Sequence, residues 1–501
     1  MGNVDDRSTA SSFKKTATVP WEDDKQARPL VHIDVGGWEE LTPLKIRSHG
    51  ASFVMQYDER YTPYIEMTGL LPFVQLVSRS TPNLNAAAVT TFIDRWRPET
   101  HSFHLRTGEM TVTLQDVSMI TALPIEGKPL CMSTDSEGWR QQMEGLIGMS
   151  PQEPEVEDGG KKDRVSAGAP FTWIAANFAH CPENADEEVI QRYARVYMWY
   201  VISRTIFADG TGKNAPWMWL KALTVFDNKF SWGSAALAYL YRQLDDACRR
   251  TTKDGGVGGC MLLLSVWSWE YLPVGRPKST QWNTWDDHGN LVRQPTWAYK
   301  WDLVSEVASA VNLLYKQYTN EMDSLTPEQV EWQPYGVGPN FGDAHTFELN
   351  PLCVQEKHLW LMRCPLICNW AVEFHLPHCV MHQFGFFQPH PPEWVDTDTQ
   401  LHRQGAEVFH GLHDQATMVS GRARGLGLGD VGVACNNSVF SSGIQSGCLF
   451  RIASNVVNRR HTRAMPVNHN VIVSGGWTRP RSIAEHIRRY RWPLQLSMLD
   501  K

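Results

Sequence analysis

The stretch from Arg95 to Leu105 reads RWRPETHSFHL, and residues 108–117 continue as GEMTVTLQDV. Just upstream, four apolar residues recur at the spacing of one helix face: Val89, Phe92, Ile93 and Trp96. We expect Pro98 to end that helix, because the residue before a proline is pushed out of the α region. The start of this stretch therefore predicts a helix followed by an abrupt change of direction.

A short β-hairpin and a second helix are predicted next. Apolar and polar residues alternate on both sides of a Thr107–Gly108 turn, the apolar ones being Phe103, Leu105, Met110 and Val112. Thr113, with Asp116 three residues later, has the pattern of a capping box. We expect the helix that it opens to end before Pro124.

Longer apolar faces at helical spacing follow in three segments, namely Val189–Val201, Leu237–Leu244 and Leu303–Tyr318. Residues 273–297 are rich in Pro, Trp, Gly and Asn and are expected to form a long ordered loop. The predicted fold class is therefore mainly α, with a small β-hairpin element. No repeat of fixed period is visible.

The helix–hairpin–helix resembles the plant mobile domain family, which occurs in transposon-encoded proteins and in host proteins related to those that maintain meristems. Further blocks fit the family pattern in the right order, beginning near Tyr197, Gly258 and Val330. The residues that carry the resemblance are Arg95, Trp96, Arg97, Glu99, Thr100, Phe103, Gly108, Glu109, Thr113, Asp116, Trp232, Gly233, Trp267, Trp332, Pro334, Tyr335, Gln383, Phe384 and Gly385. They imply one domain over most of the chain.

The resemblance implies a non-enzymatic nuclear protein of transposon ancestry, acting by binding in meristem development or maintenance and in silencing of mobile elements. The partner is left open between protein, DNA and RNA, and the cytoplasm is the alternative location. The family is also labelled aminotransferase-like, but a pyridoxal enzyme needs a Schiff-base lysine with an acidic partner for the ring nitrogen. No lysine here has such a motif, so we expect no cofactor and no small-molecule substrate.

The competing hypothesis is an enzyme relic of transposase- or phosphatase-linked chemistry with a metal-dependent site. Residues 342–345 (GDAH) are similar to the first ligand block of metallophosphatases, but the later blocks of that two-metal chemistry are missing. A transposase centre needs carboxylates converging on two metals, and spacing alone does not test that among 54 acidic residues. We therefore assign no catalytic residues.

One short region is crowded with cysteine and histidine. It contains Cys353, His358, Cys364, Cys368, His375, His378, Cys379 and His382. A structural zinc site usually draws four ligands from two closely spaced pairs, and no Cys-x2-Cys pair is present here. We therefore favour packing over metal binding for this region and predict no tightly bound metal.

Composition limits the class of protein. The 501 residues are 42% hydrophobic and 20% charged, as in ordinary soluble domains. A net charge of −7 gives no overall electrostatic attraction for nucleic acid. The most apolar run, residues 260–269, is too short to span a bilayer. Ten scattered cysteines suggest reduced thiols in the cytosol or nucleus.

We expect three parts along the chain: a disordered segment over residues 1–40, the plant mobile domain over 41–395 with an exposed loop at 148–170, and a divergent tail over 396–501. The tail is first rich in glycine and serine and then in arginine. Its candidate nucleic-acid contacts are Arg459, Arg460, Arg488, Arg489 and Arg491. The alternative is a solvated tail that binds nothing specific.

Two expectations concern the motif itself. Arg95 and Arg97 flank Trp96 and should emerge at the rim of the buried face, to meet phosphates or to pair with Glu99 and Glu109; we favour the ion pairs. The second is that three tryptophans are buried in the core: Trp96, Trp232 and Trp267.

Overall fold

A computed structural model describes residues 42–46, 55–79, 82–133, 135–152, 167–210, 212–249, 255–278, 295–301, 304, 310–336 and 349–388. Within them the predicted mainly helical class is confirmed. The helices are α1 (Thr62–Thr68), α2 (Leu71–Arg79), α3 (Ala86–Ile93), α4 (Leu114–Thr121), α5 (Trp139–Ile147), α6 (Phe171–Phe178), α7 (Glu187–Arg204), α8 (Trp217–Ala222), α9 (Trp232–Cys248), α10 (Met261–Tyr271), α11 (Val311–Asp323) and α12 (Leu352–Gln355).

Strands are short and form four small sheets. They are β1 (Lys45–Ile46), β2 (Trp96–Arg97), β3 (Ser102–Leu105), β4 (Gly108–Met110), β5 (Gly168–Pro170), β6 (Asn214–Pro216), β7 (Gly256–Val257), β8 (Cys364–Cys368) and β9 (Ala371–His375). The sheet orders are β1-β7, β2-β3-β4, β5-β6 and β8-β9. The β1-β7 pair is parallel, and the others are antiparallel.

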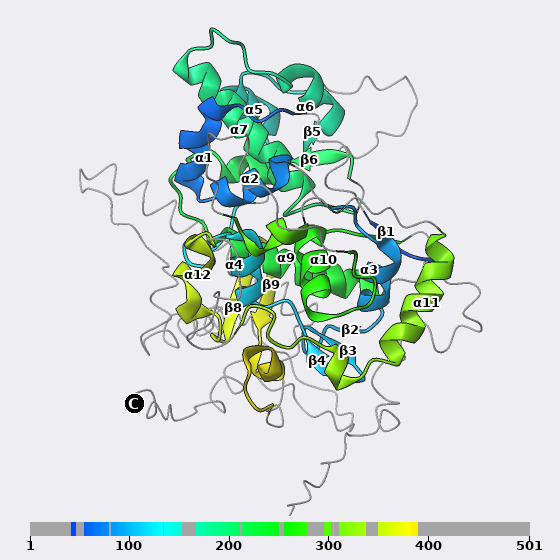
Figure 1. Cartoon of the computed structure of the whole chain (residues 1–501). Coiled ribbons are helices and arrows are strands. Elements are labelled where there is room, and N and C mark those ends of the chain that lie inside the picture. The colour runs from blue at the N-terminus through cyan, green and yellow to red at the C-terminus, as the bar shows by residue number, and fades with distance from the viewer. Residues whose placement is uncertain are drawn as a thin grey trace, which may run out of the picture.

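Helix α9 lies at the centre of the protein, beside α10 and above the β8-β9 hairpin in the view of Figure 1. It contacts α3, α4, β2 and both strands of that hairpin. Helix α7 organises the upper part of Figure 1, where it contacts α1, α5, α6 and α8. Helix α11 packs against α3 at the right-hand edge.

The motif at residues 95–117 folds largely as expected. Strands β3 and β4 form the predicted hairpin, with Phe103 opposite Met110. Thr113 and Asp116 form the predicted capping box, and α4 ends before Pro124. The expected helix through Trp96 is wrong, because α3 ends at Ile93 and Trp96 pairs with Phe103 in β2. Pro98 constrains only Arg97, the residue before it, whereas the pairing of β2 with β3 ends the helix four residues earlier, at Ile93.

Two further boundaries differ from the sequence predictions. The end of the expected 148–170 loop forms β5, with Ala169 buried and Gly168 at φ +145° against β6. A Cβ at Gly168 would lie 2.2 Å from the carbonyl oxygen of Ala215, so glycine permits the close pairing. The helix expected over Leu303–Tyr318 begins only at Val311 among the described residues.

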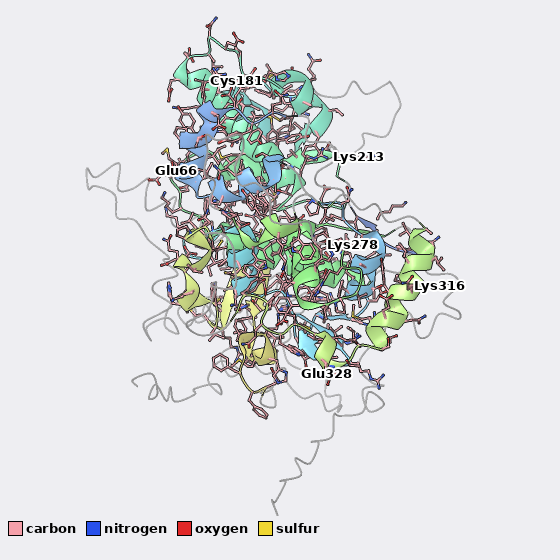
Figure 2. The ribbon with its side chains drawn as sticks, in the orientation of Figure 1. Glu66, Cys181, Lys213, Lys278, Lys316 and Glu328 are labelled. Carbon is pink, nitrogen blue, oxygen red and sulfur yellow. The ribbon has the colours of Figure 1, made fainter. Side chains whose placement is uncertain are left out.

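One apolar core runs through these elements. Buried apolar residues from Leu44 to Ala371 form a single cluster, and a small second one surrounds Val380. Side chains fill the space between the ribbons in Figure 2, whereas the labelled Glu66, Lys316 and Glu328 are exposed. Among the described residues, no helix combines the length and apolar character needed to cross a membrane.

Candidate functional site

The turn between β2 and β3 places His101 inside the protein. Its φ of +49° is in the left-handed region, which residues other than glycine adopt infrequently. Thr111 supports this conformation, because its Oγ1 donates a hydrogen bond of 2.5 Å to the carbonyl oxygen of His101. The imidazole packs against the rings of Trp96 and Tyr241, whose centroids are 6.1 and 4.9 Å away and which contact each other at 5.3 Å. This aromatic cluster helps to hold the imidazole in place.

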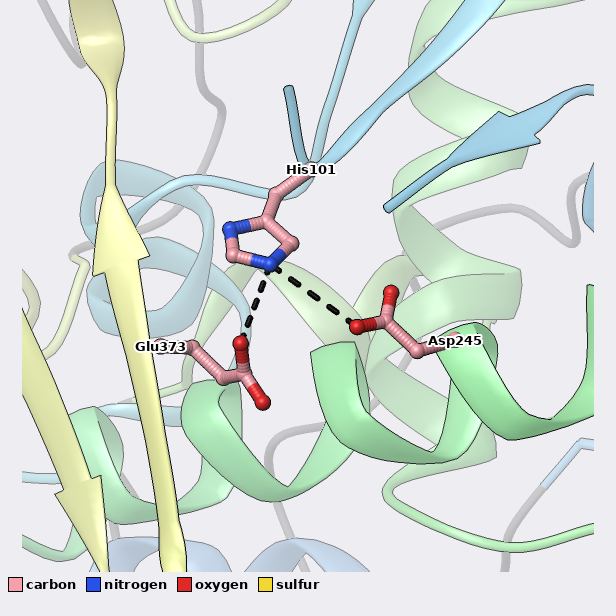
Figure 3. Close-up of side chains that lie close together, drawn as sticks. All are labelled: His101, Asp245 and Glu373. Carbon is pink, nitrogen blue, oxygen red and sulfur yellow. Dashed lines mark ion pairs between the residues drawn. The ribbon is translucent and has the colours of Figure 1, made fainter. Parts of the chain in front are cut away.

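Two carboxylates face Nε2 of His101 from separate elements (Figure 3). Oε2 of Glu373, on β9, lies 3.0 Å from Nε2, and Oδ2 of Asp245, on α9, lies 3.9 Å away. The side chain of His101 is 2% exposed, and those of Asp245 and Glu373 are 0% exposed. In the described part of the chain these three form the one His, Cys, Asp and Glu group able to hold a metal ion, with donor atoms within 4.8 Å of one another.

Two further atoms of the cluster, Nδ1 of His101 and Oδ1 of Asp245, have hydrogen-bond partners of their own. His101 Nδ1 lies 3.1 Å from the carbonyl oxygen of Phe374. A carbonyl oxygen only accepts hydrogen bonds, so Nδ1 carries a proton and Nε2 is the nitrogen that meets the carboxylates. The indole Nε1 of Trp96 donates to Oδ1 of Asp245 at 2.7 Å. Oδ2 of Asp245 is buried and has no hydrogen-bond partner among the described residues.

Burial and charge have opposing effects on the three groups. Burial lowers the pKa of His101, but its hydrogen bond with Glu373 and the charges of Glu373 and Asp245 outweigh this effect and raise that pKa overall. Burial also raises the pKa of Asp245 and of Glu373, against the opposing effect of His101. Each group thus depends on the other two for its charge state, and the cluster favours a positive charge at Nε2.

Burial also decides what chemistry the cluster can perform. A general acid or base must come within hydrogen-bonding reach of its substrate. The side chains of His101, Asp245 and Glu373 are enclosed by the core, so the arrangement suits an internal charge cluster or cation site better than an open catalytic centre. It connects the β2-β3 turn to α9 and β9, which are distant in sequence.

A second buried carboxylate, Asp116, joins three more segments. It accepts hydrogen bonds from the backbone N–H of Thr113 at 2.7 Å and from the hydroxyl of Thr113 at 2.6 Å. The hydroxyls of Tyr271 and Tyr335 donate to its other oxygen at 2.9 and 2.8 Å. Burial raises the pKa of Asp116 to about 6, although the hydrogen bonds from Thr113, Tyr335 and Tyr271 lower it.

Other motif residues join distant backbone segments. Gln383 binds the backbone of Thr111 twice, accepting from its N–H at 2.8 Å and donating to its carbonyl at 2.9 Å. Gly385 has φ +74°, and a Cβ there would lie 1.9 Å from Nε2 of Gln333. Phe384 packs partly buried against the core. The segment around Gln383 is therefore attached to the backbone of Thr111, directly after β4.

The three tryptophans are buried, as predicted. Trp96 and Trp232 are 1% exposed and Trp267 is 0% exposed. Trp232 Nε1 donates to the carbonyl of Thr68 at 3.0 Å, which connects α9 to the end of α1. Next to it, Gly233 lies so close to α4 that a Cβ would come within 2.9 Å of Val117.

The remaining motif residues are only partly buried. Trp332 is partly buried, and its ring lies 5.2 Å from that of His382. A Cβ at Gly108, where φ is +138°, would lie 3.5 Å from the same tryptophan. Pro334 and Glu99 are partly buried. Thr100 Oγ1 lies 2.7 Å from the hydroxyl of Ser102.

The ion pairs predicted between Arg95 and Glu99 or Glu109 are wrong. Arg95 pairs with Asp323 of α11, rather than with Glu99 or Glu109. Its guanidinium also donates to the carbonyl of Thr91 at 2.8 Å. Glu109 instead accepts a hydrogen bond of 2.8 Å from Ser102. The reason is tertiary: α11 packs on α3 and supplies a partner about 230 residues away in sequence.

In the cysteine- and histidine-rich segment, His375 and Cys379 are buried and take part in packing. His375 accepts from the backbone N–H of Leu114 at 3.3 Å, and its Nδ1 donates to the carbonyl of Met362 at 2.8 Å. Burial lowers the pKa of His375 to about 4, so the ring is neutral. Burial raises the pKa of the Cys379 thiol to about 12. The packing interpretation fits these contacts.

The buried cluster was not predicted from the sequence. A histidine within the motif and a buried glutamate within the short strand Ala371–His375 were the available signals. Nothing in their spacing indicates that they meet. The GDAH block at 342–345 and all five candidate nucleic-acid arginines lie outside the described residues, as do residues 1–41 and 389–501.

Three proteins of Arabidopsis thaliana are similar to this chain. The serine/threonine-protein phosphatase 7 long form homolog is 33% identical over 332 residues, covering 64% of this chain and 23% of that protein. Protein MAINTENANCE OF MERISTEMS is 33% identical over 315 residues, covering 62% of this chain and 59% of that protein. Protein MAIN-LIKE 1 is 30% identical over 323 residues, covering 62% and 56%.

The chain thus spans between about a quarter and three fifths of the length of these relatives. No solved structure matches it. The model of the plant mobile domain family matches residues 72–419, which include every motif residue from Arg95 to Gly385. The chain therefore belongs to the plant mobile domain family.

Proposed function

We propose that this protein is a nuclear plant mobile domain protein of transposon ancestry that acts by binding another protein. Its process would be meristem development or maintenance together with silencing of mobile elements. Membership of the family supports the general part of this proposal. The name of the relative MAINTENANCE OF MERISTEMS supports the process.

The use of the motif residues supports binding over catalysis. Asp116, Gln383 and Trp232 each hold distant segments together inside the core. The family motif is thereby used to build a scaffold. On such a scaffold, function falls to the surface, where family members can differ.

The proposal rests mainly on exposed apolar side chains. The described residues include nine large apolar side chains that are exposed, and five of them fall between residues 352 and 387. These five, the apolar surface set, are Leu352, Leu361, Trp370, Phe386 and Phe387. Phe387 is 85% exposed. Aromatic side chains are enriched at protein–protein interfaces and often supply most of their binding energy.

The chemistry of this set favours a protein over a nucleic acid as the partner. Nucleic-acid surfaces combine aromatic rings with clustered lysine and arginine, because phosphates dominate the affinity. The apolar surface set comes from the segments before, between and after β8 and β9, and the residues of these strands, Cys364–Cys368 and Ala371–His375, include no lysine or arginine. Burying apolar rings on a partner protein is the simpler use of this surface.

The test compares two sets of substitutions in the full chain. One variant combines Trp370→Ser, Phe386→Ser and Phe387→Ser, and the control combines Val225→Ser and Leu313→Ser, which are exposed elsewhere. Fluorescent fusions in plant cells should be nuclear for all three proteins. Cross-linking and quantitative mass spectrometry should show partners of the wild type depleted at least about tenfold in the first variant, which corresponds to about 1.4 kcal/mol.

Thermal denaturation should give similar midpoints for the two variants, so that a loss of partners is not a loss of folding. Equal depletion in both variants, or none in either, would refute the role of the apolar surface set. Exclusion of the wild type from the nucleus would refute the location.

A further inference from the structure

We propose that His101, Asp245 and Glu373 together bind one divalent transition-metal ion inside the core, as a structural site. The inference departs from the sequence expectation that no tightly bound metal is present. It goes beyond the proposed binding function, since it concerns how the domain is held together. The ion would join the β2-β3 turn, α9 and β9 at one point.

The hydrogen bonding of His101 requires a cation near Nε2. Because Nδ1 donates its proton to the carbonyl of Phe374, a neutral ring would present the lone pair of Nε2 to two carboxylates. That arrangement repels unless a proton or a metal ion lies between them. The neutral ring with Nδ1 bound to a carbonyl is also the form in which histidine binds metals.

Distances around Nε2 are compatible with shared coordination. Ligand atoms about 2.1 Å from one ion lie about 3.0–3.9 Å apart for bond angles of about 90–135°. Nε2 is 3.0 Å from the Glu373 oxygen and 3.9 Å from the Asp245 oxygen. The donor atoms all lie within 4.8 Å of one another, so a bound ion would draw the two carboxylates slightly together.

Asp245 supplies the independent observation. Trp96 donates to Oδ1 at 2.7 Å and so orients the carboxylate, as outer-shell hydrogen bonds do around metal ligands. The other oxygen, Oδ2, is buried without a hydrogen-bond partner among the described residues and points at the cluster. A buried, unpartnered carboxylate oxygen is costly, and coordination to a cation would remove that cost.

Charge favours a divalent ion. Two ionised carboxylates and a neutral imidazole carry a charge of −2, which one divalent ion balances, whereas a single proton leaves −1. One nitrogen and two oxygen donors suit zinc and its neighbours in the first transition row.

The test uses the full chain, purified through a tag without histidine. Mass spectrometry of metals should find about one zinc per chain after zinc supplementation and removal of excess. Glu373→Gln and Asp245→Asn should each lower that content at least tenfold, because each removes one ionised ligand. Asp116→Asn makes the same chemical change at another fully buried carboxylate and should leave the zinc content unchanged.

X-ray absorption of the zinc-loaded wild type distinguishes this site from the cysteine-rich segment. A shell of nitrogen and oxygen only is expected, and sulfur in the shell would overturn the proposal. Thermal denaturation with and without a chelator covers the case in which variants fail to fold. Zinc below about a tenth of an equivalent, with a midpoint unaffected by the chelator, would mean that a proton occupies the position beside Nε2.

Discussion

Asp116 is the residue whose charge is most directly tied to stability. Its pKa rises from 3.8 to about 6 on folding, because the carboxyl is buried. The folded state therefore holds the proton more tightly than the unfolded state does. This contribution to stability is fully present below about pH 3.8 and is lost as the pH rises through about 6.

We expect Asp116→Asn, which stays neutral, to cost about 2 kcal/mol more at pH 4.5 than at pH 7. Urea denaturation at the two pH values measures the difference. Asp227→Asn, at a 61% exposed position, serves as the control and should show little change with pH. A cost that instead grows toward pH 7 would mean that the four hydrogen bonds outweigh burial and keep Asp116 ionised.

Single residues were predictable from sequence where a local pattern decides them. Helical spacing identified Trp96 as buried, and the capping box identified Thr113 and Asp116. The spacing placed Trp96 on the wrong element, because a helix face and a short buried strand both require an apolar side chain there. His101 and Glu373 could not be paired, since only the tertiary fold brings residues 272 positions apart together.

At the level of helices and strands, the close contact between α9 and α4 requires a glycine at position 233. Gly233 lies so near α4 that an added Cβ would be 2.9 Å from Val117 and 2.8 Å from Ile125. We expect Gly233→Ala to destabilise the protein by about 1–3 kcal/mol, as overpacked cores do. Chemical denaturation measures this cost.

Gly145, within α5, provides the matched substitution. A Cβ there has nothing within 4 Å, so Gly145→Ala should stabilise the protein by about 0.5–1 kcal/mol through its helix preference. If Gly233→Ala and Gly145→Ala change stability in the same direction and by the same amount, the effect of Gly233→Ala does not come from the close approach of α9 to α4.

Helices were easier to predict than strands for a physical reason. The segments Val189–Val201 and Leu237–Leu244 repeat an apolar face over several turns, and α7 and α9 contain them. Strands β5 and β6 have three residues each, which is too short for alternation to be recognised. Their pairing depends on the close approach at Gly168, which only the folded chain reveals.

For the whole molecule, the distribution of charge predicts where nucleic acid would bind. Residues 451–492 contain nine arginines and one acid, a charge of +8, so the remainder of a chain of net charge −7 carries −15. We expect any affinity for DNA or RNA to come from this segment and to fall steeply with salt, because each neutralised phosphate releases a counterion.

Binding assays at two salt concentrations should compare the full chain with a variant in which Arg459, Arg460, Arg488, Arg489 and Arg491 are changed to glutamine. The variant keeps the length of the chain and is expected to lose most of the salt-dependent affinity. Equal binding by both proteins would show that these five arginines do not form the recognition surface.

The short parallel pair of β1 with β7 has a consequence for how such genes can be shuffled. Family similarity begins at residue 72, yet Leu44 is buried in the core and its N–H donates to Thr90 at 2.9 Å. Tyr61 and Ile65 are buried with it. An exon or transposon boundary placed at the start of the recognisable segment would therefore separate the domain from part of its own interior, and a transferable coding unit has to begin before residue 42.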